Sequence, residues 1–349
     1  MANSDNSVIG TGSLMLDIVT RPLRSGREVI GTFAGGSCGN VLAILSFLGW
    51  QSYPLAQIGE DDASAALMSD LRHVGVDTRF VSTNPTIHTP FVYQMLRSPG
   101  DLPTQAEAYG RVCEWSTPGA CHRFAVSCPW CGSDLPRYAA HEFDVPEDLF
   151  DLTGANVYYF DVINASSYAL AHRAAARGAL VFCELSNDDL PSMIEQVLKS
   201  AHIVKFSGER FPVVPSAIHE CDAPLVIRTL GADGLEFRWR KTKWQRQPAS
   251  TPALVRDTVG CGDWCSASLI HSLGPRGSAS LTAASHPDIL YALRLAQALA
   301  AQNCGFEAAR GAMYLISAEE CLNMAASGDM HGILPRSSTP RIKCPGCTA

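Results

Sequence analysis

The second half of the chain alternates short apolar runs with helical patterns, and this alternation limits the fold more than any other feature. The apolar runs, typical of buried strands, are 156–160, 179–183, 202–206 and 225–230. Helical patterns at 166–177 and 193–200 separate the first three runs. Strands connected by helices of these lengths pair in parallel, and a parallel sheet needs helices over both of its apolar faces. The sequence therefore predicts an α/β fold with a mostly parallel central sheet.

Composition narrows the function classes. The chain has 349 residues, of which 46% are hydrophobic and 17% charged, as expected for a globular protein with a large core. A formal net charge of −7 gives no general basic footprint for nucleic acid. No apolar run reaches the roughly 18 residues of a membrane span, and residues 1–7 are polar, unlike a signal peptide. We therefore expect a cytoplasmic protein that binds neither nucleic acid nor membrane.

Residues 257–263 read Asp-Thr-Val-Gly-Cys-Gly-Asp and precede an apolar stretch that can form a helix. Gly260 and Gly262 let the backbone approach a ligand closely. The amides of residues 260–263 would then point out of a helix N-terminus, where unpaired N–H groups and the helix dipole favour an anion. A carboxylate at this place, Asp263, can accept a proton from an attacking hydroxyl. The alternative is an ordinary N-capped helix after a glycine-rich turn.

This stretch resembles the second signature of the ribokinase-like (PfkB) sugar and nucleoside kinases, Asp-Thr-x-Gly-x-Gly-Asp, and keeps every fixed position of that pattern. The resemblance implies that Asp263 is the catalytic base. It also implies that Gly260, Cys261 and Gly262 form the anion hole for the transferred phosphoryl group.

The resemblance extends over roughly residues 8–325 and implies a ribokinase-like domain. We expect this kinase domain to span residues 1–335. A small β lid, carrying a Cys-rich insertion, is expected at about 86–140. Residues 336–349 then form a C-terminal tail with a Cys-x-x-Cys pair.

Two N-terminal elements resemble the family's substrate site. Asp17 matches an aspartate that binds substrate hydroxyls in the family, and a turn residue is the alternative. Gly35, Gly36 and Asn40 resemble the family's Gly-Gly-x-x-x-Asn element. Two glycines let a polyol lie against the backbone, and an asparagine side chain both donates and accepts hydrogen bonds. The alternative for Asn40 is a helix N-cap.

The family's nucleotide-binding elements are matched less closely than its substrate site. Residues 229–234, Thr-Leu-Gly-Ala-Asp-Gly, resemble the family's nucleotide loop, but the family's Asn-x-x-Glu element, which helps to place magnesium, is replaced by residues 207–210, Ser-Gly-Glu-Arg. Arg210 can instead bind a phosphate directly. Asn303 and Gly305 follow the helical pattern at 288–303 and are candidates for the adenine pocket, with packing as the alternative.

The resemblance thus implies ATP and Mg²⁺ as cofactors and a monovalent cation near Asp257. The predicted cofactor-binding residues are Lys205, Ser207, Glu209, Thr229, Gly231, Gly234, Asp257, Thr258, Asn303 and Gly305.

The chain holds thirteen cysteines without an export signal, which indicates thiols or metal ligands more than disulfides. A Pro/Gly/Trp-rich segment too polar to form much core carries four of them, and zinc stabilises units of this kind. The predicted ligands of a structural zinc are Cys113, Cys121, Cys128 and Cys131. A competing ligand set brings in Cys344 and Cys347, and free thiols or a redox pair are a further alternative.

The resemblance predicts an ATP-dependent kinase that phosphorylates a hydroxymethyl group of a sugar, a nucleoside or a related small molecule. A homodimer through the lid is an assembly that the resemblance allows. The alternative is a catalytically weak or inactive ribokinase-like protein that binds a ligand or regulates a partner through a zinc-knuckle element. The intact motif around Asp263 favours the enzyme, and the altered Asn-x-x-Glu element favours the alternative.

Overall fold

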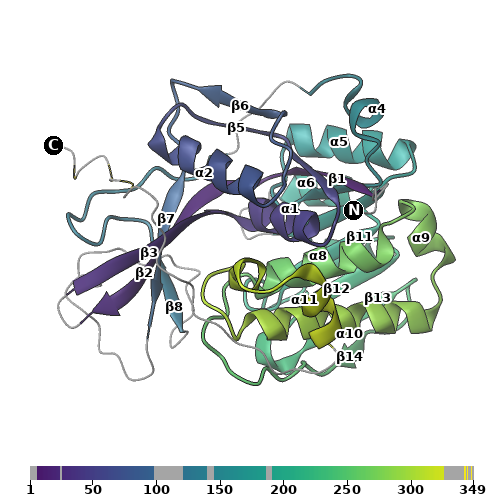
Figure 1. Cartoon of the computed structure of the whole chain (residues 1–349). Coiled ribbons are helices and arrows are strands. Elements are labelled where there is room, and N and C mark those ends of the chain that lie inside the picture. Colours follow the sequence, from purple (N-terminus) through teal and green to yellow (C-terminus); the bar gives the residue numbers. More distant parts are fainter. Residues whose placement is uncertain are drawn as a thin grey trace.

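The computed structural model describes residues 6–23, 26–97, 121–139, 145–185 and 191–325, together with residues 342, 344 and 347. A central sheet with helices on both faces carries a smaller sheet at one side (Figure 1). The predicted α/β class, with a mostly parallel sheet and a small β lid, is confirmed. Within the described ranges, no helix is long and apolar enough to span a bilayer.

The central sheet has eight strands in the order β14-β13-β12-β11-β10-β9-β1-β4. The strands from β12 to β4 pair in parallel, and β13 and β14 are antiparallel at one edge. Their bounds are β1 (Ser7–Thr11), β4 (Gln51–Pro54), β9 (Val157–Phe160), β10 (Leu180–Leu185), β11 (Ile203–Ser207), β12 (Leu225–Thr229), β13 (Leu235–Trp239) and β14 (Gln245–Gln247). The four apolar runs therefore form neighbouring strands β9 to β12, as predicted.

Two layers of helices bury the two faces of this sheet (Figure 1). One layer consists of α1 (Ser37–Phe47), α8 (Cys261–Leu273), α9 (Ser278–Ala283) and α10 (His286–Asn303). The other consists of α4 (Leu149–Thr153), α5 (Ala165–Ala176), α6 (Pro191–Leu198) and α7 (Ser216–Glu220). Along β9, Tyr159 packs in the first layer and Tyr158 and Phe160 in the second, because successive strand residues point to opposite faces.

Two of the helices begin at side chains that cap their first backbone amides. Asp61 accepts a hydrogen bond from the Ser64 amide at 2.9 Å ahead of α2 (Asp62–His73). Ser285 and Asp288 form a capping box at the start of α10. Each such cap is worth about 1 kcal/mol. The starts of α2 and α10 are therefore marked in the sequence by an Asp and a Ser.

The lid is a four-stranded sheet in the order β3-β2-β7-β8. Its strands are β2 (Met15–Leu23), β3 (Gly26–Gly35), β7 (Phe91–Leu96) and β8 (His122–Ala125). The sequence placed the lid at about 86–140, but β2 and β3 also belong to it. Residues 16–20 of β2 are all buried, so this strand lacks the polar alternation by which a half-exposed lid strand is recognised.

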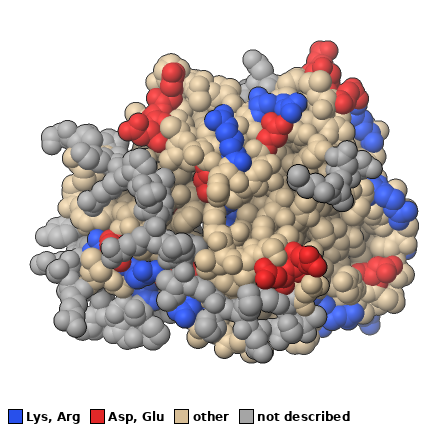
Figure 2. Space-filling view, viewed as in Figure 1, with Lys and Arg blue, Asp and Glu red and all other residues tan. Residues whose placement is uncertain are grey.

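The remaining elements pack around this framework. They are β5 (Ala56–Gly59), β6 (Val81–Asn84), α11 (Ala318–Met324) and the short 3₁₀ turns η1 (Gly231–Asp233) and η2 (Gly311–Tyr314). On the face drawn in Figure 2, the described acidic and basic side chains lie scattered, without a broad patch of one sign.

Candidate active site

Asp263 lies in the first turn of α8, and its surroundings fix the backbone there. Gly260 precedes the helix with φ of 77°, and a Cβ at Gly260 would lie 2.2 Å from the Ala309 carbonyl oxygen, so only glycine fits. The Asp263 side chain is buried and accepts a hydrogen bond from Asn40 Nδ2 at 2.8 Å. The carboxyl group therefore sits beside the first amides of the helix, which have no partner within the helix.

The pKa of Asp263 is raised to about 7. Burial raises this pKa most, and the negative charge of Glu184 raises it further. The hydrogen bond from Asn40 and the positive charge of Lys205 lower it, but by less. A carboxyl group with a pKa near 7 is well matched to proton abstraction at neutral pH.

Glu184, near the carboxyl end of β10, forms an ion pair with the buried Lys205 in the middle of β11. The Glu184 carboxylate also accepts hydrogen bonds from Ser266 Oγ at 2.6 Å and from Tyr159 OH at 3.0 Å. A Cβ at Gly262 would lie 3.7 Å from Lys205 Nζ, so the ammonium group lies beside the start of α8. Sequence reasoning missed Glu184, although an acidic residue that ends a buried parallel strand is a usable signal.

Asp17 lies in β2, so the turn alternative for it is wrong. Its carboxylate packs against Gly35, where a Cβ would lie 2.2 Å from Asp17 Oδ2. At Gly36, with φ of 76°, a Cβ would lie 2.4 Å from the Ser13 carbonyl oxygen. Both glycines are therefore required by close packing, whatever ligand lies above them.

Asn40 lies inside α1, whose N-cap is Gly36, so the N-cap alternative for Asn40 is also wrong. Within the described residues, its Oδ1 atom is buried without a hydrogen-bond partner. No hydrogen bond joins the Asp17 side chain to another residue that the structure describes. Both groups therefore retain acceptor positions that the O–H groups of a ligand can fill.

Burial raises the pKa of Asp17 to about 7, although the positive charge of Arg310 lowers it. The charge of Asp263 adds to the rise. Arg310 is itself buried and donates to the Ala34 carbonyl oxygen at 2.5 Å and to Asp70 Oδ2 at 2.6 Å. Arg310 and Asp70 were not predicted, since nothing in their local sequence distinguishes them from surface charges.

A pocket opens near the end of β1, and its lining includes Gly12, Leu14 and Tyr138. Gly12 contacts Asp161, whose buried carboxyl group accepts a hydrogen bond from the Ser13 amide at 2.8 Å. Burial raises the pKa of Asp161, and the charges of Glu184 and Asp263 contribute. The pocket is not lined by Asp17, Asn40 or Asp263, so its connection to the acidic groups runs through Gly12 and Asp161.

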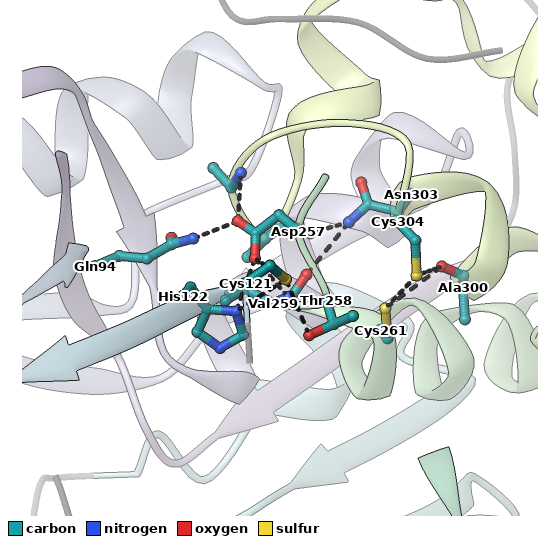
Figure 3. A network of polar contacts seen from close by, with 12 residues as sticks. Gln94, Cys121, His122, Asp257, Thr258, Val259, Cys261, Ala300, Asn303 and Cys304 are labelled. Carbon is teal, nitrogen blue, oxygen red and sulfur yellow. Dashed lines mark hydrogen bonds and ion pairs between the residues drawn. The ribbon is translucent and has the colours of Figure 1, made fainter. Parts of the chain in front are cut away.

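Asp257 is fully buried and joins the lid to the loop before α8 (Figure 3). Its Oδ2 accepts hydrogen bonds from Gln94 Nε2 at 2.5 Å and from the Ala308 amide at 2.9 Å. Its Oδ1 accepts from the Val259 amide at 3.1 Å and lies 2.8 Å from His122 Nδ1. Gln94 and His122 come from the lid strands β7 and β8. A carboxylate offers about four acceptor positions, and all four are used.

The His122 ring is positively charged at neutral pH. Burial lowers the pKa of His122, but the hydrogen bonds and negative charge of Asp257 and Cys121 raise it more, to about 9. An imidazolium group therefore occupies one side of Asp257. The predicted monovalent cation near Asp257 does not fit these residues, because the carboxylate has no acceptor position left for it.

Of the residues predicted for the nucleotide, Ser207, Glu209, Thr229, Gly231 and Gly234 lie at the carboxyl edge of the sheet. Ser207 and Thr229 are paired residues at the ends of β11 and β12. A Cβ at Gly231 would lie 3.9 Å from the exposed Glu209 carboxylate. Gly234 has φ of 92° and serves the turn into β13. This edge is where ligands bind in open parallel sheets.

Asn303 is buried and its amide is used inside the protein. Its Nδ2 donates to the carbonyl oxygens of Val259 at 3.3 Å and Ala309 at 3.1 Å, and its Oδ1 accepts from the Ala312 amide at 3.4 Å. The packing alternative is therefore favoured for Asn303, which holds the loop before α8. Thr258 is on this loop, and its hydroxyl lies 3.7 Å from Cys121 Sγ.

Gly305, two residues after Asn303, is also buried. Between these two residues, Cys304 Sγ lies 3.2 Å from Cys261 Sγ (Figure 3). The Cys261 side chain thus packs against the end of α10, so the predicted anion hole relies on the Cys261 amide and not on its thiol.

The structure assembles a four-cysteine cluster that differs from the first predicted set and includes Cys344 and Cys347 of the competing set. Its members, whose sulfur atoms lie within 4.8 Å of one another, are Cys128, Cys131, Cys344 and Cys347. Cys121 instead lies beside His122 and Asp257, and Cys113 is outside the described residues. The reason is β8, because the four residues of this strand span roughly 13 Å and carry Cys121 away from Cys128.

The chain was compared with protein-family models and with curated protein sequences. The sequence matches the family model described as pfkB family carbohydrate kinase over residues 7–102. This range contains Asp17, Gly35, Gly36 and Asn40 and ends well before Asp263. The resemblance to the PfkB family is thereby confirmed. No curated protein sequence matches the chain.

Similar solved structures extend over nearly the whole chain. A fructokinase from Xylella fastidiosa with bound ATP has a TM-score of 0.68 at 19% identity, over 93% of this chain and 99% of that chain. An Arabidopsis thaliana ribokinase complexed with ribose and ATP has a TM-score of 0.64 at 19% identity, over 92% and 98%. An aminoimidazole riboside kinase from Salmonella enterica, complexed with aminoimidazole riboside and an ATP analogue, has a TM-score of 0.63 at 18% identity, over 92% and 99%. The likeness establishes the ribokinase-like fold.

Proposed function

Because residues 7–102 match the PfkB family and the chain has the ribokinase-like fold, we propose that this protein is an ATP-dependent kinase. Its substrate is a sugar, a nucleoside or a related small molecule, and the phosphoryl group is transferred to a hydroxymethyl group of that substrate. The observation that carries the proposal is the buried Asp263 carboxyl group, held by Asn40 at the N-terminus of α8 with a pKa of about 7.

Asp263 accepts the proton of the attacking hydroxyl group. The backbone amides of Gly260, Cys261 and Gly262 stabilise the charge on the transferred phosphoryl group, because they are fixed in place before the reaction begins. Lys205 Nζ, beside Gly262, adds a positive charge at the same point. Glu184 is a positioning residue, since its carboxylate holds the Lys205 ammonium group.

Asp17 and Asn40 bind the substrate's hydroxyl groups. Both present buried oxygen atoms beside Asp263, and an unpaired buried acceptor costs about 1–3 kcal/mol until a donor reaches it. A polyol supplies several O–H donors on one face. This arrangement favours a sugar or a ribose-bearing compound over a substrate with a single hydroxyl group.

The nucleotide lies along the carboxyl ends of β11 and β12, at Ser207, Thr229 and Gly231. Magnesium, when bound, neutralises charge on the nucleotide phosphates. Mg²⁺ prefers carboxylate oxygens and keeps several of its waters. Glu209 fits such a role, since its carboxylate is exposed beside Gly231.

Replacing Asp17 or Asn40 by alanine is expected to weaken substrate binding and to leave ATP binding unchanged. A hydrogen bond that involves a charged group is worth about 1.5–3 kcal/mol, so the substrate KM should rise roughly 10- to 100-fold for Asp17→Ala. Steady-state kinetics with each substrate varied in turn measures both constants. An equal rise in both KM values would point to damage to the fold.

Turnover is expected to fall as the pH drops below about 7, because Asp263 must be ionised to accept a proton. The Asp17 carboxyl group has a similar pKa, so the observed pKa belongs to the pair. A profile of kcat/KM from pH 5 to pH 9 measures it. An acid limb near pH 4 would contradict the role given to the buried Asp263.

Turnover is expected to be independent of potassium, since His122 supplies the positive charge at Asp257. Rates measured with MgATP should agree between buffers whose only monovalent cation is potassium, sodium or N-methylglucamine. His122→Ala frees an acceptor position on Asp257, and this variant should gain activity when potassium is added. Strong potassium activation of the unchanged protein would contradict the assignment.

A catalytically weak regulatory protein is the second candidate, favoured by the replacement of the Asn-x-x-Glu element. A panel of sugars and nucleosides distinguishes the two when ADP formation is measured with MgATP. The kinase assignment predicts ADP formation that depends on one class of acceptor and is absent in Asp263→Asn. Tight ligand binding without ADP formation would support the regulatory candidate.

A further inference from the structure

We propose that Cys128, Cys131, Cys344 and Cys347 bind one Zn²⁺ ion, which fastens the C-terminal tail to the lid. The four sulfur atoms all lie within 4.8 Å of one another. Four thiolates around a tetrahedral zinc, each about 2.3 Å from the ion, stand roughly 3.8 Å apart. The cluster therefore needs only small side-chain adjustments to close around the ion. This inference goes beyond the proposed kinase function and does not depend on it.

Each half of the cluster sits on a tight turn. In the first half, the Gly132 amide donates to the Cys128 carbonyl oxygen at 2.9 Å, and the Cys128 amide donates to the Ser133 carbonyl oxygen at 2.8 Å. Gly132 has φ of 76°, which favours glycine. In the second half, the Cys347 amide donates to the Cys344 carbonyl oxygen at 3.0 Å. Two Cys-x-x-Cys turns that face each other are typical of a closed structural zinc site.

The two halves are far apart in the sequence, and each cysteine of the first turn lies close to one cysteine of the second. Cys131 Sγ lies 3.3 Å from Cys344 Sγ, and Cys128 Sγ lies 3.6 Å from Cys347 Sγ. These distances exceed the roughly 2.05 Å of a disulfide bond. Other described cysteines form at most a close pair, as Cys261 and Cys304 do, so the four-fold grouping is particular to this place.

The site connects the tail to the part of the lid that contacts Asp257 in the loop before α8. Cys128 and Cys344 are buried in one apolar cluster with lid residues such as Tyr93, and Ile342 packs against that cluster. Trp130, on the first turn, contacts the Tyr93 ring at a centroid distance of 5.2 Å. Tyr93 precedes Gln94 on β7, and Gln94 donates to Asp257. Zinc would therefore stiffen the strand that contacts Asp257.

Elemental analysis of the full chain, purified without added metal and without a polyhistidine tag, tests the site. We expect about one zinc per chain, as for a closed four-cysteine site. The Cys344→Ser/Cys347→Ser double variant should lose the zinc. Cys221→Ser/Cys321→Ser, which changes two buried cysteines elsewhere, is the matched control and should keep it.

Exchange with cobalt(II) in the unchanged protein gives a measurement that needs no variant. Tetrahedral thiolate coordination predicts intense cobalt absorption in the visible range and an equal amount of zinc released. Absence of zinc, with two disulfides found by mass spectrometry, would overturn the proposal. Retention of zinc by the tail double variant would also overturn it and would favour a local site that uses Cys113 and Cys121.

Discussion

The Asp263→Asn variant is expected to lose roughly 10²- to 10⁴-fold in kcat, the usual contribution of a general base. The amide keeps the shape of the side chain and its contact with Asn40 but cannot take the substrate's proton. ATP binding should change little, because the amides at the start of α8 and Lys205 remain. Asp222→Asn, at an exposed aspartate paired with Lys241, is the matched control and should keep full activity.

The same variant is expected to be more stable than the unchanged protein at pH 8. The folded-state pKa of Asp263 is raised from 3.8 to about 7, so this carboxyl group destabilises the fold increasingly as the pH rises from about 4, and fully above about pH 7. The gain from a neutral amide is bounded by about three pKa units, or about 4 kcal/mol. Chemical denaturation at pH 8 and at pH 5 measures it. Lost activity together with a large loss of stability would show that Asp263 is structural.

The Asp257→Asn variant is expected to lose about 3–5 kcal/mol of stability at neutral pH, the cost of removing one partner from a buried ion pair. Four donors surround Asp257, so the NH₂ group of an asparagine would face two of them. The His122 charge would also lose its partner. Denaturant unfolding of the variant and of His122→Gln measures this cost, and turnover should fall because the loop before α8 moves.

The pH dependence of this loss follows from the His122 pKa, which the fold raises from 6.5 to about 9. A raised histidine pKa contributes stability that is fully present below pH 6.5 and is lost as the pH rises through about 9. The stability difference between the unchanged protein and Asp257→Asn should therefore shrink as the pH rises from about 6.5 to about 9. A difference that stays constant from pH 6 to pH 10 would contradict the ion pair.

The strands and helices of the second half were predictable because their patterns are local. Buried parallel strands appear as continuous apolar runs, and two of the helix starts carry the capping residues Asn164 and Ser285. The sequence resemblance also placed Asp17, Gly35, Gly36 and Asn40, which the structure brings together beside Asp263.

The unpredicted parts depend on contacts between distant segments. Gln94 and His122 reach Asp257 only because β7 and β8 pair in the lid. Arg310 meets Asp70, which lies 240 residues earlier in the sequence. The four-cysteine cluster unites a lid turn with the tail, so the local spacing of Cys113 to Cys131 did not single it out, and Cys344 and Cys347 entered only as the competing ligand set.

The most direct test of the kinase assignment is the transfer of the γ-phosphoryl group of ATP to an acceptor. The protein is incubated with MgATP and a panel of sugars and nucleosides, and each product is examined by mass spectrometry and ³¹P NMR. The assignment predicts one phosphomonoester whose phosphorus signal is split by two methylene protons, formed by the unchanged protein and not by Asp263→Asn. Equal yields from both proteins, or ATP hydrolysis without any phosphorylated acceptor, would contradict it.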